Sequence, residues 1–236
     1  MDKNMRVIFI IICVLISTLS FSQDKVELIN KGNKYFQEGD FEKAEHYYKQ
    51  SLEIDNKYYK ANLNTGHALF RQAFSLIQQQ DTSGLKKCSE AELFYNNSTE
   101  LTKNKNEKAE SLYNLGNSQL LGQKIEESIE SYKKSLRLIP KNMNAKHNLA
   151  LAQYLLNKKQ ENQDNQKDSK KEQEEKKSEE EKDQNQENNQ QNKPKAELSK
   201  EEIEQILNAL EREEKEVQED LQEKKVIGGD KLLKDW

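Results

Sequence analysis

The residues best suited to chemistry in this chain are three histidines and two cysteines, because imidazole and thiolate groups serve as metal ligands, bases and nucleophiles. His46, His67 and His147 fall in separate helical patterns, and no two of them stand at a ligand spacing such as H-x-x-x-H. Cys88 follows two lysines that could lower its pKa, but no sequence feature supplies a base, so we expect a buried or idle thiol. No phosphate-binding glycine loop occurs either. The sequence therefore predicts no catalysis, no metal or cofactor site and no small-molecule substrate.

The N-terminus is organised like a secretory signal peptide. A basic start is followed by an unbroken apolar run, residues 7–16, and then by small residues at Ser20 and Ser22. The run is shorter than the ~20 apolar residues that a membrane-spanning helix needs. We predict a signal peptide over residues 1–22, export to the periplasm and a mature chain that begins at Gln23. The alternative is an uncleaved segment that anchors the protein in the inner membrane.

The bulk composition indicates a folded part and a solvated part. Of the 236 residues, 34% are charged and 33% hydrophobic, and the mean hydropathy is −1.12. This composition is too polar for one globule that uses the whole chain. The formal net charge of −4 is small and mixed in sign, so it lacks the basic footprint of a nucleic-acid-binding protein.

The solvated part begins where the composition changes, near Asn157. Between Lys158 and Lys195 the sequence has no aliphatic or aromatic side chain. A segment with nothing to bury cannot offset the entropy that it loses on ordering. We predict a disordered linker rich in Lys, Glu and Gln over residues 158–197, in which opposite charges at helical spacing can form transient helix.

Before the linker, apolar residues recur at helical spacing, and two units share one register. The shared positions are Gly32, Ala44, Tyr48, Ser51 and Asn56 in one unit, and Gly116, Ser128, Tyr132, Ser135 and Pro140 in the other. This register resembles the tetratricopeptide-repeat (TPR) family, whose period is about 34 residues. The resemblance implies stacked helix pairs, which glycine and small residues allow to approach closely while the tyrosines fill the gap between neighbouring pairs.

A middle unit departs from this register. It opens at Gly66, but Ala91, Tyr95 and Ser98 arrive late by about a dozen residues, which indicates an insertion. A further helical pattern follows the third unit and suits a cap on an open-ended stack. We expect lengthened helices over residues 59–79 and 85–102, an enlarged turn at residues 78–84, and a capping helix over residues 145–156.

The TPR resemblance implies a peptide-binding groove along the first helix of each pair. One asparagine follows the glycine of a unit, another lies two residues before the next small residue, and this pair occurs twice. In TPR domains that clamp peptide carboxylates, asparagines at these places hydrogen-bond the ligand backbone. Ile29 and Tyr113 stand where such clamps have lysine, which disfavours carboxylate specificity, although Arg71 supplies a charge. Asparagine is also common as simple helix-end or solvent-facing decoration. The predicted groove contacts are Asn33, Asn64, His67, Arg71, Asn117 and Asn148.

The C-terminal region, residues 198–236, begins with a well-formed helix start. Ser199 is expected to cap the helix, Glu202 to complete a capping box, and Leu198 to pack on Ile203. An amphipathic helix beyond a linker has no core of its own, so it must dock on the repeats, pair with a second copy or bind a partner. Its apolar stripe consists of Ile203, Ile206, Leu207, Leu210, Val217 and Leu221.

Two features bear on whether this helix docks on the repeats, pairs with a second copy or binds a partner. Glu213 and Asp220 fall where a heptad seam requires apolar residues, which disfavours a long coiled coil. The terminal Trp236 is either a recognition anchor or part of a disordered end. The predicted tail contacts with a partner are Ile203, Leu207, Leu210 and Trp236.

The order of the segments, together with the C-terminal sequence LSKEEIEQILNALEREEKEVQEDLQ and the final KDW, resembles the BatC-type TPR proteins of the aerotolerance (Bat) operons. The resemblance implies a periplasmic adaptor that associates with von Willebrand factor A-type membrane proteins of the same operon. Any membrane contact would then be made through these partners.

Together these features predict an all-α protein: a TPR solenoid over residues 23–157 with a capping helix, then the linker and an isolated amphipathic helix. The predicted function is that of an exported adaptor or scaffold for envelope proteins in aerotolerance or stress resistance. The alternative is a structural protein that self-associates through its C-terminal helix.

Overall fold

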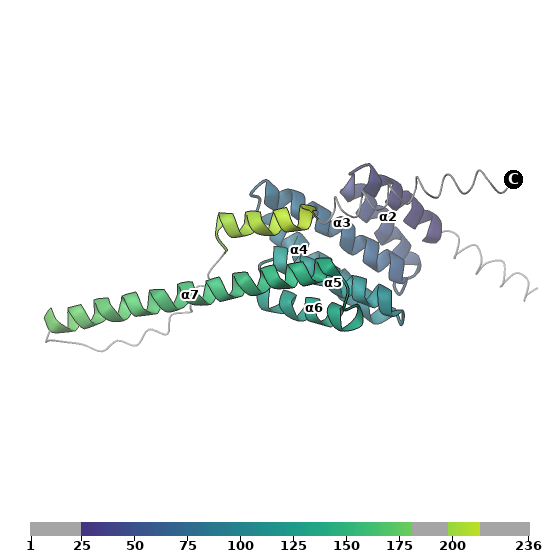
Figure 1. The fold of residues 1–236 in the computed structure, drawn as a ribbon. Helices are drawn as coiled ribbons and strands as arrows, with labels where there is room; N and C mark the ends of the chain where they lie inside the picture. The colour runs from purple at the N-terminus through teal and green to yellow at the C-terminus, as the bar shows by residue number, and fades with distance from the viewer. Residues whose placement is uncertain (1–24, 181–197, 213–236) are drawn as a thin grey trace, which may run out of the picture. The chain divides into compact units, whose positions relative to one another are not determined.

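The structure, a computed structural model, describes residues 25–180 and 198–212 (Figure 1). Every regular element within these two ranges is a helix. The chain divides into two compact units, Met1–Lys146 and His147–Trp236. The all-α class expected from the sequence is therefore confirmed, whereas the predicted signal peptide, residues 1–22, lies outside the described residues.

The described part of the first unit is a series of helical hairpins. Each helix packs against the next along the chain, and the first helices of the second and third hairpins also touch. Figure 1 shows the hairpins stacked side by side, from purple through teal. This arrangement is a solenoid of helical hairpins, the architecture expected from the sequence. The hairpins pair residues 25–37 with α2 (Phe41–Ile54), α3 (Tyr59–Gln78) with α4 (Ser83–Leu101), and α5 (Lys105–Leu121) with α6 (Ile125–Leu138).

Within each hairpin, a buried tyrosine of the second helix packs directly against a glycine of the first. The contact is so close that it leaves no room for a side chain at the glycine, which explains why glycine recurs there. The pairs are Gly32 with Tyr48, Gly66 with Tyr95, and Gly116 with Tyr132, where an added Cβ atom would lie 2.4, 2.7 and 2.6 Å from the ring Cε1.

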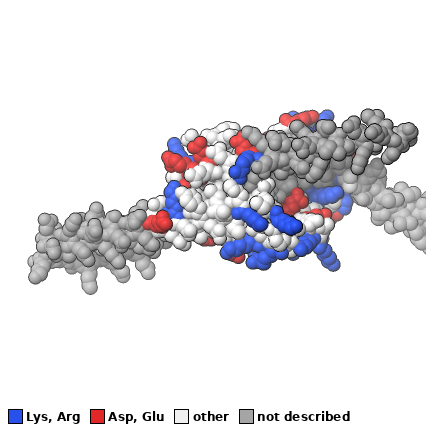
Figure 2. All heavy atoms as spheres, viewed as in Figure 1, with Lys and Arg blue, Asp and Glu red and all other residues white. Residues whose placement is uncertain are grey.

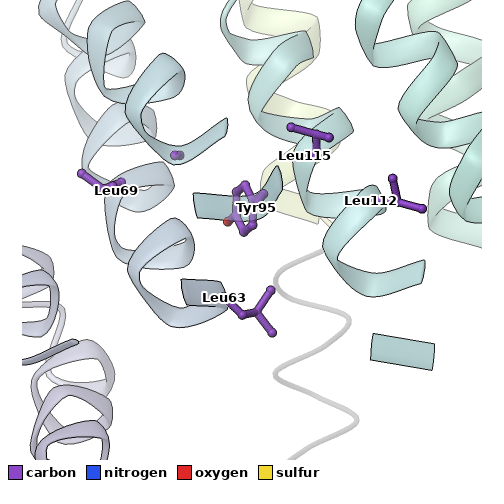
Figure 3. Close-up of a cluster of buried hydrophobic side chains, with 6 residues drawn as sticks. Leu63, Leu69, Tyr95, Leu112 and Leu115 are labelled. Carbon is purple, nitrogen blue, oxygen red and sulfur yellow. The ribbon is translucent and has the colours of Figure 1, made fainter. Parts of the chain in front are cut away.

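The same tyrosines also bridge neighbouring hairpins, as the sequence predicts. Tyr95 of α4 belongs to one buried cluster with Leu63 and Leu69 of α3 and with Leu112 and Leu115 of α5 (Figure 3). A second cluster joins the first hairpin to α3 in the same way, around the ring of the equivalent tyrosine. The rings of Tyr48 and Tyr95 therefore each join their own hairpin to the next.

The three hairpin turns share one backbone geometry. The second residue after the first helix has a positive φ, +79° at Gly39 and 62° at both Gln80 and Gln123. The next residue donates its N–H to a carbonyl five residues earlier, which is the Schellman arrangement that ends a helix. These bonds run from Asp40 to Tyr35 (2.9 Å), from Asp81 to Leu76 (2.9 Å) and from Lys124 to Gln119 (2.8 Å).

The enlarged turn expected at residues 78–84 is not present. Only residues 79–82 separate α3 from α4, and they form the same turn as in the other hairpins. The extra residues lengthen the two helices, as expected, to 20 and 19 residues against 14 in α2. Residues in a helix make hydrogen bonds and packing contacts that residues in a long loop would not make. The inserted residues therefore extend the helices, and Gly66 keeps its contact with the Tyr95 ring.

α7 (Met143–Glu180) corrects the boundary of the capping helix and of the linker. The helix was expected to end at Leu156, but it continues through the first part of the predicted linker to Glu180. That stretch contains no Gly or Pro and is rich in Lys, Glu and Gln, which are good helix formers. Residues 181–197, the remainder of the predicted linker, lie outside the described residues.

The C-terminal helical segment, residues 200–212, begins as predicted. Ser199 N–H donates to Glu202 Oε2 (2.8 Å), and Glu202 N–H donates to Ser199 Oγ (3.3 Å), which together form the capping box. The segment is not isolated, however. Lys158 Nζ of α7 lies 3.2 Å from Glu202 Oε1, so the segment is ion-paired to a helix of its own unit.

The glycine–tyrosine contact predicts a large penalty for a single methyl group. Gly116→Ala places a Cβ against the ring of buried Tyr132, and we expect a loss of about 2–3 kcal/mol in the free energy of unfolding. Gly39→Ala is the matched control, since its Cβ meets nothing and only the positive φ costs about 1 kcal/mol. Urea denaturation measures both, and equal losses would contradict the packing argument.

The turns predict a stabilising substitution. Gln80→Gly relieves the positive φ of an exposed side chain and should raise the free energy of unfolding by about 0.5–1 kcal/mol. Gln79→Gly, one residue earlier at a φ of −82°, should instead be destabilising, because there glycine only adds freedom to the unfolded chain. The two melting temperatures, compared with that of the wild type, should therefore move in opposite directions.

Candidate protein-binding face

The candidate binding residues of the first unit all lie on the first helix of a hairpin. Asn33 is in the helical residues 25–37, His67 and Arg71 are on α3, and Asn117 is on α5. We call the face formed by these first helices the candidate binding face. Figure 2 shows a face of the molecule whose centre consists of uncharged side chains, with Lys, Arg, Asp and Glu around it.

Asn33 and Asn64 are joined across adjacent hairpins. Asn64 Nδ2 donates to Asn33 Oδ1 at 3.0 Å, and the Tyr48 hydroxyl donates to the same oxygen at 2.8 Å. The asparagine pair thus bridges two units, as its spacing in the sequence indicates. Both amides are partly exposed, so their contact with a ligand stays a prediction.

Asn117 repeats the tyrosine contact but is buried. Its Oδ1 accepts a hydrogen bond from the Tyr132 hydroxyl at 2.8 Å, and only 6% of the residue is exposed. Asn148, in the second unit, has no exposed surface. Buried amides of this kind stabilise the fold, because leaving the tyrosine hydroxyl unpaired would cost about 1–3 kcal/mol. Neither side chain is open to a ligand in this state.

The middle hairpin breaks the pattern of hydrogen bonds. His67 stands after the glycine where the other hairpins have asparagine, and its ring centroid lies 5.6 Å from that of Tyr95. The Tyr95 hydroxyl is buried and has no hydrogen-bond partner among the described residues. Burial raises the pKa of Tyr95 well above its usual value, with a smaller contribution from Glu110. His67 was predicted as a binding residue, whereas Tyr95 was predicted only as a packing position of the repeat, and its hydroxyl lacks this hydrogen bond.

Arg71 is held by aromatic rings. Its guanidinium carbon lies 5.1 Å from the ring centroid of Phe41 and 5.6 Å from that of Phe74, within cation–π range. The first ring belongs to α2 and the second to α3, so the arginine helps to join two helices. The charge expected to serve a ligand therefore has a structural use as well.

A polar network that the sequence analysis did not identify links three helices. Gln72 Nε2 of α3 donates to Glu45 Oε2 of α2 at 2.7 Å, and Lys87 Nζ of α4 lies 3.4 Å from the same oxygen. Burial opposes ionisation of Glu45, yet hydrogen bonds from Lys49 and Gln72 hold its pKa below the ordinary value. Only the three-dimensional packing brings these residues together, so no spacing in the sequence indicates them.

Cys88 is a buried thiol, as predicted from the sequence. It is fully buried, and burial raises its pKa to about 12 despite the two preceding lysines. A thiol with that pKa is a poor nucleophile. Across the described residues, no group of three or more His, Cys, Asp or Glu is arranged to hold a metal ion. The described helices likewise include none long and apolar enough to cross a membrane.

The side chains predicted to contact a partner in the tail differ in how far they are buried. Ile203 and Leu207 are partly exposed, whereas Leu210 and its neighbour Ile206 are buried. Trp236 lies outside the described residues. The apolar face of this helix is therefore already covered in the structure, which changes how it could meet a partner.

His67 predicts a pH dependence of stability. Burial lowers its pKa to about 4 from an ordinary 6.5, so the unfolded chain binds the proton more readily. The contribution of the uncharged His67 ring to the free energy of unfolding is therefore fully present above pH ~6.5 and is lost as the pH drops toward 4. We expect a loss of about 1–3 kcal/mol, the size being limited because His67 is only partly buried.

His67→Asn should abolish this slope and also supply the acceptor that the Tyr95 hydroxyl lacks. Urea denaturation at pH 7.5 and pH 5 measures the difference. The substitution His46→Asn, at an exposed position of α2, is the control and should keep the wild-type slope. A slope that survives in His67→Asn would show that other groups cause it.

Two segments of the chain match models of the tetratricopeptide repeat, residues 26–58 and 109–142. They correspond to the first and third hairpins, whose glycine–tyrosine register is regular. No curated protein matches the chain.

Solved structures similar to this chain include TPR domains. The first TPR domain of the human RPAP3 protein is 25% identical, with 58% of this chain and 96% of that one covered and a TM-score of 0.49. The first TPR of Spaghetti (RPAP3), bound to the HSP90 peptide SRMEEVD, is 27% identical, with coverages of 57% and 94% and a TM-score of 0.48. The N-terminal domain of stress-induced protein-1 from C. elegans is 15% identical, with coverages of 56% and 97% and a TM-score of 0.47. Residues 26–58 and 109–142 of the present chain are thus similar to tetratricopeptide repeats.

Proposed function

We propose that this protein is a non-catalytic adaptor that binds a peptide segment of a partner protein on its candidate binding face. Tetratricopeptide repeats are protein-interaction modules, and this chain carries two matched repeats around a third hairpin of the same build. The observation that carries the proposal is the partly exposed amide bridge between Asn33 and Asn64. Side-chain amides can both donate to and accept from a peptide backbone.

The middle hairpin is the centre of this proposed face. His67 makes no hydrogen bond to any described residue, and it lies on α3 one helical turn from Asn64. A neutral imidazole offers one donor and one acceptor, like the amides beside it. The low pKa of His67 keeps the ring uncharged near neutral pH. Backbone amides of a bound segment suit such a surface better than a carboxylate does.

We further propose export and an envelope partner. The basic start and the short apolar run at residues 7–16 support export to the periplasm. The terminal KDW and the segment from Leu198 support a BatC-type adaptor, with von Willebrand factor A-type membrane proteins as partners in aerotolerance or stress resistance. Self-association through the C-terminal helix is less favoured, because the buried side chains of that helix are already covered within one chain.

Peptide binding is tested with the full chain as bait and a phage-displayed library of random peptides as the probe. Selected peptides are then measured by fluorescence anisotropy against Asn64→Ala and His67→Ala. We expect each variant to weaken binding about five- to tenfold, since each loses about one hydrogen bond. Circular dichroism checks that both variants remain folded.

The matched control is Asn96→Ala, an exposed asparagine on α4 outside the candidate binding face. It should bind as the wild type does. If no peptide is enriched, or if Asn96→Ala weakens binding as much as Asn64→Ala, the proposed face is wrong. Enrichment confined to peptides that need a free C-terminal carboxylate would contradict the preference for backbone amides.

A further inference from the structure

The C-terminal segment 200–212 is too short to be a stable helix by itself. Isolated helices below ~12–15 residues are marginal in water, so most of their stability in proteins comes from packing. Within this segment Ile206, Ala209 and Leu210 are only 1%, 8% and 6% exposed, and Leu198 just before it is 9% exposed. The helix therefore exists because its apolar face is covered.

One carboxylate joins this helix to α7. Glu202 accepts the N–H of Ser199, completing the capping box, and its Oε1 atom lies 3.2 Å from Lys158 Nζ. The glutamate side chain is 7% exposed and that of the lysine 37%. Burial opposes ionisation of Glu202, but the backbone N–H of Ser199 and the Lys158 ammonium outweigh it and hold the pKa below the ordinary value. A charge in such a place is tolerated only while its partner is present.

The pair connects residues that are far apart in the chain. Lys158 lies in α7, whereas Glu202 comes after residues 181–197 in the sequence. If the pair is broken, the buried carboxylate loses its cation, and the short helix loses part of what holds it in place. Docking of the helix therefore depends on one electrostatic contact at the edge of an apolar interface.

We propose that Lys158 and Glu202 form an electrostatic latch that controls whether the apolar face of residues 198–212 is covered or available to a partner. The matching partner presents an apolar helix face flanked by a lysine or arginine, because such a surface offers Glu202 the contact that α7 now supplies. The inference rests on the proposed adaptor function only for the use of the released helix. The latch itself is a property of the folded chain.

Hydrogen–deuterium exchange of the full chain, followed by mass spectrometry, tests the latch. Glu202→Gln keeps the capping box, since glutamine also serves at that position, but removes the charge. Lys158→Gln removes the other half. We expect either variant to speed amide exchange in residues 200–212 about five- to tenfold, and the double variant to be no faster than the single ones. Glu204→Gln, at an exposed position of the same helix, is the control and should exchange like the wild type.

Salt gives a second, independent readout. Raising the ionic strength from about 0.05 to 0.5 M should speed exchange of the same peptide in the wild type but not in Glu202→Gln, because screening acts only on the charged pair. Unchanged exchange in Lys158→Gln, or effects of the two substitutions that simply add, would overturn the latch. Neither outcome involves a ligand, so failure of the latch leaves the proposed peptide binding standing, and failure of peptide binding leaves the latch standing.

Discussion

The fold depends on the contact between one glycine and one tyrosine in each hairpin. The glycine lets the helices approach until the ring touches the backbone, and the ring then reaches the next hairpin. Because one side chain serves both interfaces, the angle within a hairpin and the stacking between hairpins are set together. This coupling explains why the middle hairpin can lengthen its helices without disturbing the stack: Gly66 and Tyr95 keep their contact while the extra residues extend the helices beyond it.

The same contact determines which polar residues are available for binding. In the first and third hairpins the tyrosine hydroxyl uses an asparagine as its acceptor, so much of the hydrogen-bonding capacity of that amide serves the fold. The middle hairpin has histidine instead and leaves the Tyr95 hydroxyl without a partner among the described residues. A buried hydroxyl that lacks the hydrogen bond made in the neighbouring hairpins lowers the stability of its hairpin by about 1–3 kcal/mol. Functional sites are where such local costs are expected.

Much of the fold could be predicted from the sequence because its determinants are local. The register from Gly32 to Asn56 recurs from Gly116 to Pro140, and the capping box at Ser199 is readable over four residues. The predictions that were wrong or missing depend on physical effects that the spacing of residues in the sequence does not show. The length of α7 depends on helix propensity in a segment with no apolar pattern. The role of Tyr95 appears only when its hydroxyl is seen to lack the acceptor that its two counterparts have.

The C-terminal helix shows how an apolar stripe can serve two purposes in turn. From the sequence, the stripe must be covered by something, and the structure shows Ile206 and Leu210 of it buried within the chain, with Glu202 paired to Lys158. A permanently docked helix would favour a purely apolar contact, since a partly buried ion pair adds little net stability. A charge at that edge instead makes docking sensitive to competing cations and to salt. The position of Glu202 is therefore better explained by reversible docking than by stability alone.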